Sequence, residues 1–164
     1  MDLWRLDALS ADVRAARAEG DLDRAKQLLA EAVELWRGEP LPDLADLPDA
    51  EPGLEADRLR ALHGRNLLDL GELCLVSGEP SRAGYLADRV LARDPFAPRA
   101  HRLLLAAALK GRDPARVTAA RATVVAALAQ LGEPADGATA LLLRQALPPT
   151  GGREQRGAVV SSWR

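Results

Sequence analysis

The strongest constraint on the fold of this chain is a recurring pattern of amphipathic segments that end at glycine or proline. Within each segment apolar residues return every three or four positions, which is the period of an α-helix packed on one face. Gly20, Gly78 and Gly132 follow such segments and are expected to end helices, and Gly20 suits the left-handed conformation that often does so. Gly78 and Gly111 lie 33 residues apart, a spacing typical of proteins built from repeated helical hairpins. The pattern therefore predicts an all-α fold.

Composition supports this prediction, because 48% of the residues are apolar but only 3% are aromatic, and Ala and Leu are good helix formers. Asp21 is placed to cap a second helix, Pro80 suits a first helical turn, and Asp113 followed by Pro114 is typical of a helix start. We predict seven helices: 2–19, one that extends to Trp36, a long one that ends at Ser77, one from Pro80, 98–110, 114–131 and 136–147.

Between the second and third predicted helices, the segment from Arg37 to Pro52 contains four prolines among acidic residues and cannot propagate a helix. Its leucines give it apolar surface, so we expect an ordered loop. Residues 1–147 have the length of one domain, and the tail 148–164 is expected to be disordered.

Charge is unevenly distributed along the chain, although the formal net charge is only -2. Residues 1–82 contain 10 Lys+Arg and 18 Asp+Glu, whereas residues 83–164 contain 12 and 6. This asymmetry is compatible with docking of a charged partner, with head-to-tail self-association, or with internal neutralisation. No segment has the pattern of a signal peptide or a membrane span, so we expect a cytoplasmic protein that does not enter a membrane.

No group of residues has the pattern of a catalytic, cofactor or metal site. His63 and His101 fall on apolar helix stripes, which favours structural roles. Cys74, the single cysteine, lies on the same stripe as His63 and is expected to be a buried, unreactive thiol. Apart from Gly151-Gly152 in the tail, glycines occur singly, and none belongs to a phosphate-binding loop motif. The chain is therefore predicted not to be an enzyme and to need no cofactor.

Residues 64–97 resemble a tetratricopeptide repeat, with Leu67, Leu70 and Gly71 in the first helix, Ala83 in the second, and Asp94-Pro95 at the end. The flanking units are weaker copies, so the resemblance implies a tetratricopeptide-like α-α superhelix of about seven helices. In such repeats the first helices line a concave groove. The charged residues at groove positions are Arg65, Glu72, Arg99, Arg102 and Lys110. Arg99, Arg102 and Lys110 could bind carboxylates of a partner, or the whole face could simply be solvated.

A second resemblance covers about residues 2–147 and rests mainly on the hexapeptide Trp36-Arg37-Gly38-Glu39-Pro40-Leu41 at a helix end. The other segments that carry it are Arg58-Leu59, Asp94-Pro95 before Arg99-Ala100-His101-Arg102-Leu103, and Leu131-Gly132-Glu133-Pro134. Together these segments are similar to the bacterial transcriptional activator domain of Streptomyces-type antibiotic regulatory proteins.

In typical members this domain follows a winged-helix DNA-binding domain, whereas Met1 here begins at the first activator-domain helix. The resemblance implies a non-enzymatic module of a transcriptional regulator that binds either itself, as a homodimer, or the transcription machinery. It implies no contact with DNA through these residues. The alternative is a tetratricopeptide adaptor, unrelated to transcription, that binds an extended peptide.

Overall fold

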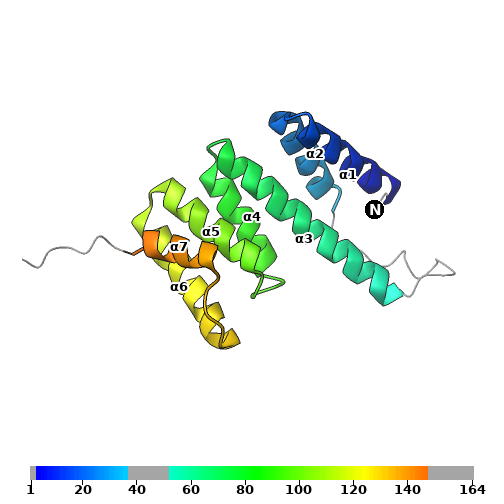
Figure 1. Ribbon diagram of the computed structural model, residues 1–164. Coiled ribbons are helices and arrows are strands. Elements are labelled where there is room, and N and C mark those ends of the chain that lie inside the picture. Colours follow the sequence, from blue (N-terminus) through cyan, green and yellow to red (C-terminus); the bar gives the residue numbers. More distant parts are fainter. Residues whose placement is uncertain (1–2, 37–51, 148–164) are drawn as a thin grey trace, which may run out of the picture.

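The computed structural model describes residues 3–36 and 52–147, and all regular elements in these ranges are α-helices. The predicted all-α class is confirmed, and each predicted helix is found within a few residues of its expected bounds (Figure 1). The helices are α1 (Leu3–Ala18), α2 (Leu22–Glu34), α3 (Pro52–Val76), α4 (Pro80–Leu91), α5 (Pro98–Gly111), α6 (Pro114–Leu131) and α7 (Gly137–Gln145). The predicted loop, apart from Pro52, and the predicted tail lie outside the described residues.

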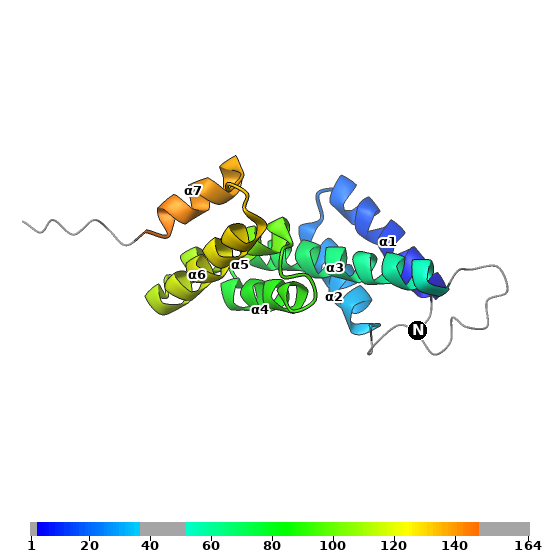
Figure 2. The same cartoon turned by 90° about the horizontal axis from the view of Figure 1, so that it is seen from below.

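The first six helices form three hairpins that stack side by side. Helix α1 packs on α2, α3 on α4, and α5 on α6, while α2 contacts α3 and α4 contacts α5 between hairpins (Figures 1 and 2). Helix α7 packs on α5. Each second helix thus lies against the first helix of the next hairpin, which is the arrangement of a repeat superhelix.

Left-handed residues close the turns where the sequence predicts them. Gly20 and Gly78 have φ of 76° and 84° and join the helices of the first two hairpins. In the third hairpin glycine stands one position early, so Arg112 occupies the left-handed position with φ of 54°. Asp21 and Asp113 accept hydrogen bonds from backbone N–H groups of the helices that follow them, which confirms both predicted caps.

Two of the hydrophobic clusters of the described residues meet along α3, whose 25 residues span two hairpins. Leu59 packs with Leu6, Leu9 and Trp36 of the first hairpin. Leu67 and Cys74, farther along α3, pack with α4 and α5 residues. The stripes of residues that recur every three or four positions in α1, α3 and α4 are buried, as this period predicts; their buried members are Leu6, Leu9, Val13, Ala16, Leu59, His63, Leu67, Leu70, Cys74, Ala83, Leu86, Ala87 and Val90.

At Gly71, α3 packs tightly against Leu103 of α5. A Cβ atom added at Gly71 would lie 2.5 Å from Leu103 Cδ2 and 3.6 Å from the carbonyl oxygen of Ala83. An alanine here would require the Leu103 side chain to move, and that side chain is only 3% exposed and closely packed. The glycine of the predicted repeat therefore sets the spacing between adjacent hairpins.

The period of apolar residues in α6 places Leu131 on the same side as Ala120 and Val124 and predicts that it is buried. This prediction is wrong, because Leu131 is 44% exposed. Helix α7 packs on α5, where Thr139 and Ala146 become buried, and Leu128 of α6 packs against the cluster that contains Ala146, whereas Leu131 stays exposed.

Candidate interaction surface

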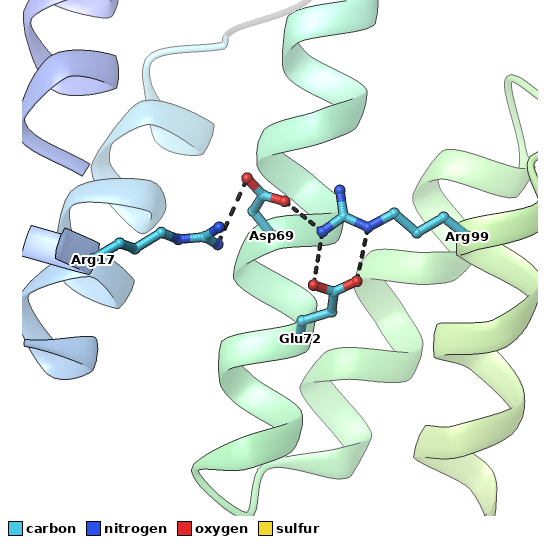
Figure 3. A network of polar contacts seen from close by, with 4 residues as sticks. All are labelled: Arg17, Asp69, Glu72 and Arg99. Carbon is cyan, nitrogen blue, oxygen red and sulfur yellow. Dashed lines mark hydrogen bonds and ion pairs between the residues drawn. The ribbon is translucent and has the colours of Figure 1, made fainter. Parts of the chain in front are cut away.

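The first helices α1, α3 and α5 contribute charged side chains to one connected network (Figure 3). Arg99, in the first turn of α5, donates from Nε and Nη2 to the two carboxylate oxygens of Glu72, each at 2.7 Å. Arg99 Nη2 also donates to Asp69 Oδ1 at 2.5 Å. Arg17 of α1 lies 3.6 Å from the other oxygen of Asp69, so one network links all three hairpins.

The geometry around Arg99 is that of a strong ion pair. A bidentate contact between guanidinium and carboxylate combines two charge-assisted hydrogen bonds, and here a second carboxylate adds a third. The hydrogen bonds that Arg99 donates to Glu72, followed by the one that it donates to Asp69, raise the pKa of Arg99 above its usual range. Arg99 is half-buried, so a partner protein that competed for it would first have to displace Glu72 and Asp69.

Two other predicted groove residues are also bound within the chain. Arg102 Nη1 lies 3.0 Å from Asp136 Oδ2, and Asp136 caps α7 by accepting from the backbone N–H groups of Ala138 and Thr139. The bonds from Thr139, with a smaller contribution from Arg102, lower the pKa of Asp136. Arg102 therefore helps to attach α7 to α5.

Lys110 Nζ donates to the carbonyl oxygen of Leu75 at 2.5 Å. A cation at this position is favourable because the C-terminal end of α3 has a partial negative charge. Arg65 is exposed and forms no ion pair with any described residue. The structure thus brings Glu72 and Arg99 together and ties Arg102 and Lys110 to other elements, which leaves Arg65 as the predicted groove cation still open to a partner.

Sequence reasoning missed Asp69, Arg17 and Asp136, which are the intramolecular partners. One signal was available, since Asp69 and Glu72 are three residues apart and share a helix face. Leu68, which lies between Arg65 and Glu72 in α3, is buried in the main hydrophobic cluster.

His63 and His101 are both buried and both lie away from the Arg99 network. The ring of His63 stacks on Trp36 with centroids 4.4 Å apart and planes inclined by 9°. Burial, assisted by Arg89 and Arg93, lowers the pKa of His63 to about 4, so the ring is neutral near pH 7.

His101 Nε2 lies 2.8 Å from the carbonyl oxygen of Pro95, at the turn that precedes α5. Cys74 is fully buried, and burial raises the pKa of its thiol. Within residues 3–36 and 52–147, no group of three His, Cys, Asp or Glu side chains is placed to hold a metal ion.

The profile of the bacterial transcriptional activator domain matches residues 1–115, which is more than half of the chain. The chain belongs to this family. The match includes the stacked helices α1 to α5 and the Arg99 network, and it ends in the first turn of α6. Most of α6 and all of α7 therefore lie beyond the region that matches the activator-domain family.

Comparisons with curated proteins and with solved structures gave no match for this activator-domain chain. In the part of the chain that the structure describes, no helix has the length and apolar character needed to span a membrane.

Proposed function

We propose that this activator domain is a non-enzymatic interaction module of a bacterial transcriptional regulator, which acts by binding a second copy of itself or another protein of the transcription machinery. The observation that best supports this proposal is the family match over the stacked hairpins. In the proposal the domain works in the cytoplasm, and residues 1–147 act as one unit. Recognition of DNA is assigned to a different domain or subunit of the regulator.

The buried histidines favour this role over catalysis. His63 is stacked against Trp36, and His101 is bound to a backbone carbonyl oxygen, so neither is placed in an open cleft with a second reactive group. The Arg99 network instead fixes the relative positions of three hairpins, which is a requirement of a rigid binding scaffold.

The face formed by α3 and α5 is the proposed partner-binding groove, with Arg65, Glu72, Arg99, Arg102 and Lys110 as its charged residues. Because Arg99 is held by two carboxylates, its reversal to glutamate would place three acidic groups together and disturb the fold. Arg65 is the better probe, since it is exposed and has no ion pair among the described residues.

The experiment measures self-association of the whole chain by light scattering and capture of purified RNA polymerase on immobilised chain. Arg65→Glu should weaken capture, whereas Arg144→Glu, the same change on an exposed residue of α7, should not. A chain that stays monomeric at all concentrations and captures no polymerase would overturn the proposal.

A further inference from the structure

The first and last helices of the three-hairpin stack each have a second apolar face that no described element covers. In α1 the buried residues are Leu6, Leu9, Val13 and Ala16. With 3.6 residues per turn, the opposite side of the helix displays a separate row. This row, which we name the α1 outer face, consists of Trp4, Ala8, Ala11, Ala15 and Ala18, all of them exposed. Trp4 is 88% exposed, which is unusual for the largest apolar side chain.

Helix α6 has a similar row on the side opposite its buried residues Ala120, Val124 and Ala127. The α6 outer face consists of Ala115, Ala119, Ala122, Ala126 and Ala129, all of them exposed. A helix that is apolar on both sides is normally buried on both sides, and the end of a repeat stack normally has a polar outer surface. Helix α6 departs from both rules, and α7 leaves its outer face uncovered because it packs on α5.

The two outer faces match in spacing and in position within the stack. In each row the intervals are four, three, four and three residues, so an antiparallel pair would place Ala11 opposite Ala122 and Ala15 opposite Ala119. Alanines at every crossing position allow two helices to approach closely. Trp4 would then lie near the last turn of α6, where Leu131 is also exposed.

This pairing repeats a contact that the chain already makes twice. The second helix of one hairpin packs on the first helix of the next at α2 with α3 and at α4 with α5. Helix α6 is the second helix of the last hairpin and α1 is the first helix of the first hairpin. A contact between α6 of one copy and α1 of another would therefore continue the same stack.

Charge favours this head-to-tail contact over a symmetric one. Residues 3–36, which contain the first hairpin, have five Lys+Arg and seven Asp+Glu. Residues 98–147, which contain α5 to α7, have seven and three. The two ends thus have opposite net charges, and a contact between two identical ends would bring like charges together.

We propose that a second copy of this chain docks its α1 outer face onto the α6 outer face, which extends the superhelix from one molecule to the next. This inference rests on the proposed self-association and assigns it a surface. A helix of 16 residues is about 24 Å long. One helix–helix contact of this length falls at the low end of specific interfaces, so association should have a dissociation constant in the micromolar range. Because the contact is not symmetric, each molecule keeps one open end and the assembly grows with concentration.

The test uses one substitution on each face of the whole chain. Ala11→Glu on the α1 outer face and Ala122→Glu on the α6 outer face place a charge at the centre of the contact and should each raise the dissociation constant at least about tenfold. Ala61→Glu, the same change at an exposed position of α3, is the matched control and should associate like the unaltered chain. Far-UV circular dichroism confirms that all three variants remain folded.

Mixing the two face variants gives the decisive measurement. The Ala11→Glu chain keeps an intact α6 face, and the Ala122→Glu chain keeps an intact α1 face, so the mixture should form one-to-one dimers by analytical ultracentrifugation and stop there. Each variant alone should remain monomeric at the same concentration.

Three results would overturn the inference: an unaltered chain that stays monomeric up to about millimolar concentration, variants that associate as well as the control, or a mixture that stays monomeric. If the chain associates and captures polymerase but the face variants have no effect, the proposed function stands and only this surface assignment fails.

Discussion

Replacing Gly71 with alanine is expected to destabilise the chain, even though alanine is the better helix former. In an exposed helix interior the change would stabilise by about 1 kcal/mol. At Gly71 the new methyl group would lie 2.5 Å from Leu103 Cδ2, and Leu103 is only 3% exposed. Overpacking of this kind costs about 1–3 kcal/mol. We therefore expect Gly71→Ala to lower the free energy of unfolding by about 1 kcal/mol.

Gly64→Ala is the matched control, because Gly64 lies in the same helix and nothing stands within 4 Å of its added Cβ. This variant should gain roughly 0.5–1 kcal/mol, which separates the two glycines by about 2 kcal/mol. Urea unfolding followed by circular dichroism measures both values.

A second variant tests the cause of the loss. Leu103→Val removes the methyl group that clashes, so it should cost less in the Gly71→Ala background than in the unaltered chain, by about 1 kcal/mol of coupling. If Gly71→Ala and Gly64→Ala proved equally stable within about 0.5 kcal/mol, α3 and α5 would not be in the close contact that also positions Glu72 against Arg99.

Three further outcomes can be measured on the same chain. The pKa of His63 is about 4 in the folded chain against an ordinary value of 6.5, so the folded state binds fewer protons than the unfolded state. The free energy of unfolding should therefore fall by up to about 3 kcal/mol as the pH falls from 6.5 towards 4. His63→Phe should remove this pH dependence, which urea unfolding at several pH values would measure. Arg112→Gly should raise the melting temperature, since a non-glycine residue in the left-handed region costs about 1 kcal/mol; an unchanged or lower melting temperature would count against strain there. Cys74 should react with a thiol reagent only at the rate of unfolding, and rapid labelling under native conditions would contradict its burial.

Local features made the helices and turns predictable. Asp21 and Asp113 cap the helices that follow them because each needs only the next few backbone N–H groups, and Gly20 and Gly78 end helices because only their own φ angle matters. The repeat spacing added the pairing of helices into hairpins. Gly111, the glycine near the third turn, could be read from the sequence, whereas the left-handed conformation of the next residue, Arg112, could not.

The interaction surface was predictable only in part. Glu72 of α3 and Arg99, Arg102 and Lys110 of α5 were expected at groove positions, and the spacing of the three cations within α5 could be read directly. Their own partners could not, because the Arg99 contacts join residues 27 and 30 positions apart and depend on how one hairpin stacks on the next.

By itself the sequence determined that this chain forms capped helices joined by tight turns, because those choices depend on short-range backbone geometry and on the period of apolar residues. The tertiary structure alone decided which charges neutralise one another and which apolar faces stay uncovered. Helix α7 packs on α5 and leaves the α6 outer face exposed. Which surface α7 covers depends on contacts between residues distant in sequence, and the period of apolar residues within a helix does not encode such contacts.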